Sequence, residues 1–204
     1  MDKPVIIIAT NNLGKIREIR EIGKNIPVLF KSLKDIWPEP VNIPETGTTF
    51  EENAQMKAAW VFTRKVTWTL ADDSGLEVDL LNGEPGVYSS RYAGDAQNDQ
   101  ENIRKLLKKL NGASVQERTA RFRCVMVLKG PDYTERIVSG TCRGSIALES
   151  RGSEGFGYDP IFIPDGFSNT FAEMEPSVKN GISHRGKALQ ALKEELYELF
   201  GKPE

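Results

Sequence analysis

The sequence predicts an α/β protein with a mixed β-sheet, and two features carry this prediction. Residues 5–9, Val-Ile-Ile-Ile-Ala, form a continuous apolar run rich in β-branched residues, as in a strand buried on both faces, and a helical pattern follows it. Residues 121–129 and 134–147 alternate like strands and are joined by a Gly-Pro-Asp turn, which predicts an antiparallel hairpin. Together they predict a sheet with both strand directions.

Size and charge restrict the class of protein. With 204 residues, 39% of them hydrophobic, the chain can bury one sizeable core, and we expect a single domain over residues 1–204 with an extended hairpin lobe. Lysine and arginine number 27 against 29 acids, which argues against a general nucleic-acid-binding surface. An anionic ligand must therefore be bound by individually placed residues.

The chain carries no sign of a membrane or an oxidising compartment. Its apolar segments are shorter than the roughly 20 residues of a membrane span, and residues 1–9 lack the pattern of a signal peptide, so we expect a cytoplasmic protein without a membrane partner. Cys124 and Cys142 lie in apolar, strand-like surroundings without CxxC spacing. We expect them to be reduced core thiols rather than metal ligands.

The first polar loop, Thr10–Lys15, connects the first strand to a helix whose apolar face is marked by Ile16, Ile19 and Ile22. A helix N-terminus directs free N–H groups and a positive dipole end toward an anion, and Lys15 adds a full charge. The spacing is not that of a Walker A loop. A capped turn without a ligand remains the alternative.

A second helix is predicted to begin at Thr49, which forms a capping box with Glu52. Lys57 falls on this helix, and Glu45 precedes it in a proline-containing loop. Taken by themselves, Glu45 could be an exposed loop acid and Lys57 a solvated cation. Whether Glu45 and Lys57 belong to a ligand site instead depends on the segments that follow them in the chain.

Asp72 and Asp73 follow a strand-like run, residues 66–71, and precede Ser74 and Gly75, so we expect the acids to lie at a turn. Two carboxylates about 4 Å apart repel by roughly 4 kcal/mol at an effective dielectric near 20. A protein keeps both ionised only with a countercharge, and a divalent cation is the usual one. The alternative is a solvated turn with no ligand.

After the acids, residues 83–92 combine glycine and proline in a stiff loop that can hold Arg91 in a set position. A third helix is predicted next, with its lysines on a solvated face and an apolar stripe of Ile103, Leu106, Leu107 and Leu110.

A second dense cluster lies near the C-terminus. Residues 155–160, Gly-Phe-Gly-Tyr-Asp-Pro, alternate glycine with aromatic rings, so that the backbone can approach a flat ligand on which a ring stacks. His184, the sole histidine, and Arg185 lie where a last helix begins. An aromatic core patch with a hydrogen-bonded histidine would explain any one of these residues, but it does not explain the cluster.

Six segments together resemble the inosine triphosphate pyrophosphatase family, which hydrolyses noncanonical purine nucleoside triphosphates. The resemblance runs from Val5 to the last helix, and the segments occur in the family's order. They are residues 10–15, TNNLGK; 45–54, ETGTTFEENA; 71–76, ADDSGL; 85–92, PGVYSSRY; 155–160, GFGYDP; and 182–186, ISHRG.

The resemblance implies an elongated central mixed β-sheet flanked by helices, with two lobes around an active-site cleft. It also implies a Mg²⁺ cofactor, usually a homodimer, and hydrolysis of ITP, dITP and XTP to the nucleoside monophosphate and pyrophosphate. The family pattern differs at Asn11, where many members have glycine, and at Pro44, where an acid is common. Neither difference removes a charged residue of the predicted site.

The resemblance also implies roles for particular residues. Glu45 and Asp73 would bind Mg²⁺, and Asp73 would be the general base toward water. The predicted substrate-binding residues are Thr10, Asn11, Asn12, Leu13, Gly14, Lys15 and Lys57 at the phosphates, Ser74, and on the nucleoside side Phe156, Gly157, Tyr158, Asp159, Lys179, His184 and Arg185.

Base choice is expected to depend on the 6-position of the purine. Hypoxanthine and xanthine carry an acceptor oxygen at this position, whereas adenine carries an amino donor. Donors from His184, Arg185 or nearby backbone would therefore bind hypoxanthine and xanthine and disfavour adenine. Guanine shares the 6-keto group, and the sequence does not show how it is rejected. Two alternatives remain open: a nucleotide-binding sensor without turnover, and a general nucleic-acid binder.

Overall fold

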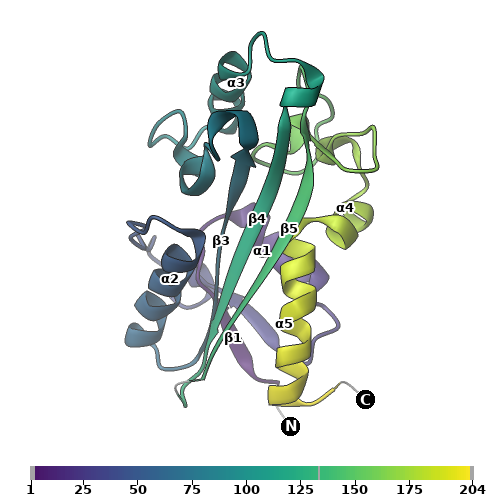
Figure 1. Cartoon of the computed structure of the whole chain (residues 1–204). Helices are drawn as coiled ribbons and strands as arrows, with labels where there is room; N and C mark the ends of the chain where they lie inside the picture. The colour runs from purple at the N-terminus through teal and green to yellow at the C-terminus, as the bar shows by residue number, and fades with distance from the viewer. Residues whose placement is uncertain (1–2, 133, 203–204) are drawn as a thin grey trace. The chain divides into compact units, whose positions relative to one another are not determined.

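The computed structural model in Figure 1 describes residues 3–132 and 134–202. It has a six-stranded β-sheet and helices, so the predicted α/β class is confirmed. The strands and α-helices are, in chain order, β1 (Val5–Ile8), α1 (Leu13–Ile22), β2 (Leu29–Ser32), α2 (Phe50–Arg64), β3 (Trp68–Val78), α3 (Asp99–Lys109), β4 (Thr119–Lys129), β5 (Glu135–Ile146), β6 (Phe162–Pro164), α4 (Pro176–Ile182) and α5 (His184–Phe200).

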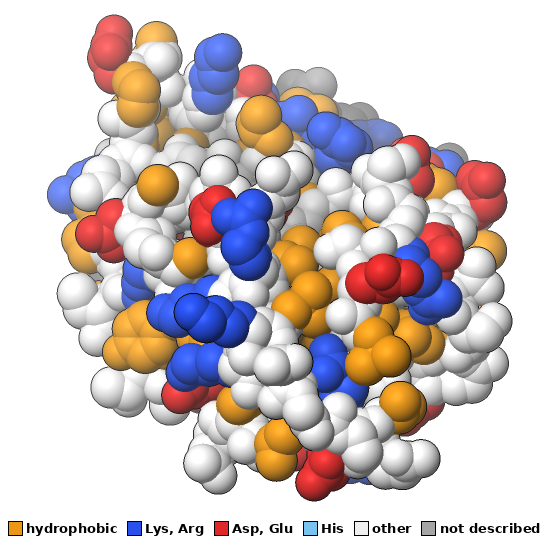
Figure 2. All heavy atoms as spheres, turned by 90° about the horizontal axis from the view of Figure 1, so that it is seen from above, with side chains coloured by type: hydrophobic (Ala, Val, Ile, Leu, Met, Phe, Trp, Pro, Cys, Tyr) orange, Lys and Arg blue, Asp and Glu red, His pale blue; other side chains and the backbone are white. Residues whose placement is uncertain are grey.

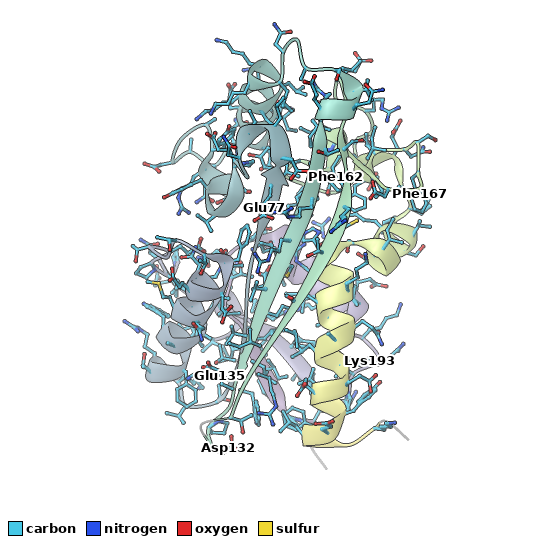
Figure 3. All side chains as sticks on the ribbon, viewed as in Figure 1. Glu77, Asp132, Glu135, Phe162, Phe167 and Lys193 are labelled. Atoms are coloured by element: carbon cyan, nitrogen blue, oxygen red, sulfur yellow. The ribbon has the colours of Figure 1, made fainter. Side chains whose placement is uncertain are left out.

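The sheet has the strand order β2-β1-β3-β4-β5-β6. β1 is parallel to both of its neighbours, with Ile6 opposite Phe30 and Trp68, whereas β5 and β6 are antiparallel. β4 and β5 are adjacent and joined by a short connection, which only antiparallel strands allow. Gly130 N–H donates to the Thr134 carbonyl (2.8 Å) near the hairpin tip, where Figure 3 labels Asp132. The mixed sheet and the hairpin are therefore confirmed.

The chain divides into two compact units. The first comprises the described parts of Met1–Asp73, Cys124–Gly140 and Arg185–Glu204, and the second comprises Ser74–Arg123 and Thr141–His184. β3, β4 and β5 each contribute residues to both units. The single domain with two lobes around a cleft stays a prediction.

The core of the first unit lies where α1 and α5 cover one face of the sheet. The inward residues of β1, β3 and β4 alternate with period two, as expected for strands, and the helices contribute apolar residues at helical spacing. These buried residues include Ile6, Ile8, Ile16, Ile19, Leu70, Cys124, Met126, Leu128, Leu189, Leu192 and Leu196.

Side-chain caps define where the first two helices begin. The side chain of Asn12 accepts from Lys15 N–H at the start of α1 (3.0 Å). Thr49 and Glu52 form the capping box predicted for α2, with the Thr49 hydroxyl accepting from Glu52 N–H (3.1 Å). Local sequence therefore sets the start of both helices.

The core of the second unit is aromatic. Phe122 packs edge-on against Phe162 at a centroid distance of 4.7 Å, and Phe162, labelled in Figure 3, packs against Phe171 at 5.0 Å. α3 adds the stripe predicted from the sequence, with Ile103, Leu106 and Leu110 buried. Further members of this core are Leu76, Val78, Tyr92, Ala120, Cys142, Ile146, Tyr158, Ile161 and Met174.

The predicted turn at the two acids is wrong. β3 runs unbroken from Trp68 to Val78, and Asp72 and Asp73 lie inside it with exposed fractions of 0% and 5%. Aspartate, serine and glycine favour turns through local hydrogen bonding and backbone freedom, but that preference is weak. Here the pairing of β3 in the sheet and cations from other elements outweigh it.

Both cysteines are buried and neither forms a disulfide, as predicted. Burial raises the pKa of the Cys124 thiol to about 12, so this side chain is a neutral core group.

On the face shown in Figure 2, basic side chains occur in small groups with acidic side chains nearby. Among residues 3–132 and 134–202, no helix is both long and apolar enough to span a membrane.

The cap of α2 can be tested by replacing threonine with alanine at two positions, the cap itself and a site inside the helix. Thr49→Ala removes the acceptor for Glu52 N–H and is expected to lower the free energy of unfolding by about 1 kcal/mol in urea titrations. Thr63→Ala, an exposed site inside the same helix, is the matched control and is expected to be neutral or slightly stabilising. Equal losses at both sites would contradict the assignment.

Candidate functional site

The two neighbouring acids of β3 point to opposite faces of the sheet because side chains alternate along a strand. Asp72 shares the face of Leu70, which α1 and α5 cover. Asp73 lies on the other face, where it contacts two side chains of α2. One strand therefore delivers two carboxylates to two separate surroundings.

Asp72 is a buried carboxylate with two cations. Its Oδ2 lies 3.1 Å from Lys15 Nζ and 3.4 Å from an Arg185 guanidinium nitrogen, and Arg185 also pairs with Glu18 of α1. Burial alone would raise the pKa of Asp72, but Lys15, Arg185 and Lys57 together hold it well below its usual range. Asp72 is therefore an anion that balances the cations of α1 and α5.

Asp73 meets a different pair of side chains. Its Oδ1 lies 2.8 Å from Lys57 Nζ, and its Oδ2 accepts from Asn53 Nδ2 (3.2 Å). Asn53 and Lys57 are four residues apart on α2 and so lie on one side of the helix. Asn53 also accepts from Gly47 N–H (2.8 Å), which ties the loop before α2 to the same point.

Lys57 joins the two predicted metal ligands. Its Nζ is 3.2 Å from Glu45 Oε1 as well as 2.8 Å from Asp73 Oδ1, and its side chain is 3% exposed. Burial alone would lower the pKa of Lys57, but Asp73, Glu45 and Asp72 raise it above its ordinary value. A charged ammonium group therefore brings a loop carboxylate and a strand carboxylate together.

This donor set fits a hard divalent cation. Within the described residues, no group of three or more His, Cys, Asp or Glu side chains could hold a metal ion. Glu45 and Asp73 each place a carboxylate oxygen against Lys57 Nζ, and Mg²⁺ typically takes one or two carboxylates and completes its shell with waters and substrate phosphates. The residues therefore suit a metal that arrives with a phosphate ligand.

The first loop leads into the N-terminus of α1 in the same unit. Asn11 and Asn12 are exposed, and Asn11 Nδ2 donates to the Val41 carbonyl (2.6 Å), which fixes the loop. α1 begins directly after Asn12, so its first N–H groups have no partner within the helix. Lys15 projects from this first turn toward Asp72, and the predicted binding of phosphates by this loop stays a prediction.

The second unit holds the other predicted cluster, built around Asp159. Its Oδ2 accepts from Phe156 N–H (2.9 Å) and from Lys179 Nζ (2.7 Å), and both charged side chains are buried. Lys179 Nζ also lies 5.2 Å from the centre of the Phe156 ring. A Cβ on Gly155 would lie 2.0 Å from Asp159 Oδ2, so only glycine fits there.

Two predicted nucleoside residues are packed more deeply than the sequence indicates. Tyr158 is buried, its hydroxyl donates to the Ser89 carbonyl (2.9 Å), and burial raises its pKa above the ordinary value. His184 stacks on Phe122 with a centroid distance of 4.6 Å and an interplanar angle of 9°. Both side chains contribute to the core, and their contact with substrate stays a prediction.

The structure thus brings together Lys15, Arg185 and Asp72, and separately Glu45, Lys57 and Asp73, within the first unit. The second unit brings together Phe156, Gly157, Asp159 and Lys179 with Tyr158, while Ser74 follows Asp73 along β3. Arg185, predicted on the nucleoside side, places its guanidinium against Glu18 and Asp72. Its predicted base contact is therefore a role that these ion pairs do not show.

Sequence reasoning missed two residues that position the predicted ones. Asn53 holds Asp73, and its spacing of four from Lys57 on the predicted helix was an available signal. Glu18, one helical turn after Lys15, pairs with Arg185, and no local pattern indicates a partner so distant in the chain.

The comparisons with known proteins identify the family of the chain. The model of the Ham1 family matches residues 6–195, so the chain belongs to the Ham1 family. A protein of Bacillus anthracis named dITP/XTP pyrophosphatase is 45% identical over 197 residues, covering 96% of this chain and 97% of the relative. One of Geobacillus kaustophilus with the same name is 47% identical over 196 residues, 96% of each chain.

Solved structures show the same fold. The Ham1 protein of Coxiella burnetii has a TM-score of 0.85 and 42% identity, covering 96% of this chain and 99% of that one. The Staphylococcus aureus Ham1 protein has a TM-score of 0.84 and 41% identity over the same shares. The family resemblance stated from the motifs is therefore confirmed.

The counterion role of Asp72 predicts a large loss of stability in Asp72→Asn. The buried Arg185 guanidinium and the partly exposed Lys15 ammonium would lose the full countercharge at this position, and we expect the free energy of unfolding to fall by about 3 kcal/mol or more at pH 7. Asp79→Asn, an exposed acid further along the chain, is the control and should change it little.

The same variant has a defined pH dependence. The folded pKa of Asp72 is depressed, so its contribution to stability is complete above the unfolded value of about 3.9 and is lost as the pH falls toward the folded pKa. The difference between wild type and Asp72→Asn should therefore shrink by about 1 kcal/mol between pH 7 and pH 3 in urea titrations. A difference that grows on acidification would contradict the assignment.

Proposed function

We propose that the chain is a nucleoside triphosphate pyrophosphatase that hydrolyses ITP, dITP and XTP to the monophosphate and pyrophosphate, and so removes noncanonical purines from the nucleotide pool. Its relatives with 45% and 47% identity over nearly the whole chain are named dITP/XTP pyrophosphatases, which supports the reaction class. The proposal rests on the Glu45–Lys57–Asp73 group, in which a partly exposed loop acid and a buried strand acid share one buried lysine.

The first unit supplies what phosphate chemistry needs. The N-terminus of α1 and Lys15 would bind the phosphate chain, with Lys57 as a further cation. Glu45 and Asp73 would hold Mg²⁺, which when bound neutralises phosphate charge and carries waters. Removing one donor to the developing charge typically costs about 3 kcal/mol of transition-state binding.

Asp73 is the proposed general base. It would accept a proton from the water whose oxygen attacks the α-phosphorus, while the bond from that phosphorus to the pyrophosphate oxygen breaks. Asn53 and Lys57 hold the two carboxylate oxygens in place, so the base is oriented before substrate binds. The leaving pyrophosphate departs with its electron pair and is stabilised by the cations around it.

The second unit supplies the proposed base-recognition segment, residues 156–159 with Lys179. The Phe156 ring would stack on the base, and the Lys179 ammonium, which also pairs with Asp159, would donate to a 6-keto acceptor. A 6-amino group would instead place a donor against this donor and lose the hydrogen bond, which would disfavour ATP. His184 and Arg185 remain proposed contributors, and a homodimer remains part of the proposal.

The substrate is tested by pyrophosphate release with Mg²⁺ from a panel of ITP, dITP, XTP, GTP and ATP. We expect release from the first three, and a fall in kcat of about 10²- to 10⁴-fold in Asp73→Asn. Asp79→Asn is the control and should retain activity. Tight ITP binding without pyrophosphate would support a sensor instead, and full activity of Asp73→Asn would remove Asp73 from its role.

The metal role of Glu45 is tested by titrating Mg²⁺ at saturating ITP. Loss of one of two carboxylates in Glu45→Gln should raise the Mg²⁺ concentration for half-maximal rate by about tenfold or more. Glu51→Gln, an exposed acid in the first turn of α2, is the matched control. An unchanged Mg²⁺ requirement in Glu45→Gln would exclude Glu45 as a ligand.

A further inference from the structure

Residues 156–159 form a turn, and each of these four residues takes part in a hydrogen bond that holds it in place. Asp159 N–H donates to the Phe156 carbonyl (3.3 Å), and Phe156 N–H donates to the Asp159 carboxylate (2.9 Å). Tyr158 is fixed through its hydroxyl to the Ser89 carbonyl. These contacts close the turn on itself and tie Tyr158 to Ser89.

The hydrogen bond that holds Gly157 comes from Asp99, an exposed residue outside the predicted site. Gly157 N–H donates to Asp99 Oδ2 at 2.7 Å, and Asp99 is the first residue of α3, 58 positions earlier in the chain. Gly157 has φ +61°, a region that glycine enters without steric cost. The N–H side of the peptide between Phe156 and Gly157 is therefore held by one carboxylate from another element, while its carbonyl accepts from Asp159 N–H within the turn.

The orientation of this peptide determines what the turn presents to a ligand. In a planar trans peptide the Phe156 carbonyl points away from Gly157 N–H, and it therefore points away from Asp99 and toward Asp159 N–H. Without Asp99, only the longer hydrogen bond from Asp159 N–H (3.3 Å) would hold this peptide, and the glycine would allow it to rotate and redirect the Gly157 N–H. The position of the Phe156 ring would change with it.

Ser89 and Asn102 hold the surroundings of this turn in the second unit. The Ser89 hydroxyl accepts from Leu76 N–H (2.9 Å) and donates to the Gly86 carbonyl (2.6 Å). Asn102, on the same helix as Asp99, donates to the Ser90 carbonyl (3.0 Å) and accepts from Ala93 N–H (2.6 Å). α3 is thus anchored firmly enough for Asp99 to act as a fixed point.

We propose that Asp99 is a positioning residue for the purine base: its carboxylate fixes the Phe156–Gly157 peptide and so sets the hydrogen-bond pattern by which 6-keto purines are preferred. This inference rests on the proposed function. Asp99 acts through Gly157 and the Phe156 ring, and it leaves the chemistry at Asp73 unchanged. Because Asp99 is exposed, its replacement does not empty a core position.

The test compares Asp99→Ala, Asp99→Asn and the matched control Glu101→Ala with the wild type. Glu101 is also an exposed acid in the first turn of α3, but it pairs with Arg104 instead of the turn. We expect Asp99→Ala to raise the KM for ITP about five- to tenfold, with kcat within about twofold, and to relax discrimination against ATP. Asp99→Asn keeps an acceptor oxygen and should remain close to wild type.

Amide hydrogen exchange supplies a readout that does not depend on activity. The Gly157 amide should exchange faster in Asp99→Ala than in the wild type and Glu101→Ala, while the melting temperature of all three stays similar. An unchanged KM, unchanged discrimination or unchanged Gly157 exchange in Asp99→Ala would overturn the inference. So would equal effects in Glu101→Ala.

The wild-type reaction separates the two claims. If the wild type releases no pyrophosphate from ITP, the proposed function fails and the inference fails with it. If the wild type is active and Asp99→Ala behaves like it, the inference alone is wrong.

Discussion

Two neighbouring buried carboxylates in one β-strand are the constraint on which the first unit depends. A buried carboxylate is costly unless cations and hydrogen bonds surround it, and two in succession would also repel each other. Strand alternation separates Asp72 from Asp73, and each face then supplies its own cation, Lys15 and Arg185 on one side and Lys57 on the other. The placement of α1, α2 and α5 follows from this requirement as much as from the apolar core.

The two acids have different consequences for function. Asp72 is fully buried and pairs with Lys15 of the first turn of α1, so its effect on the proposed phosphate binding would pass through Lys15. Asp73 shares Lys57 with a loop carboxylate and is held by Asn53, an arrangement that suits its proposed roles as base and metal ligand. We propose that this second group directs water to the α-phosphorus of a nucleoside triphosphate.

Much of the fold could be predicted because its signals are local. The buried run at β1, the capping box at Thr49 and the hairpin near Asp132 each depend on a few consecutive residues. Local turn preference wrongly predicts a turn at the acids, because their partners come from three helices and lie between 16 and 113 positions away along the chain. For the same reason the contact between Asp99 and Gly157, 58 positions apart, had no signal in the sequence.

The proposal that the Asp73 group directs water to the α-phosphorus is tested by finding which phosphorus is attacked. Hydrolysis of ITP in water enriched in ¹⁸O, followed by mass spectrometry of the products, shows which phosphorus receives the solvent oxygen. If water attacks the α-phosphorus, we expect one ¹⁸O atom in the inosine monophosphate and none in the pyrophosphate. Label in the pyrophosphate, or release of inorganic phosphate as the first product, would contradict it.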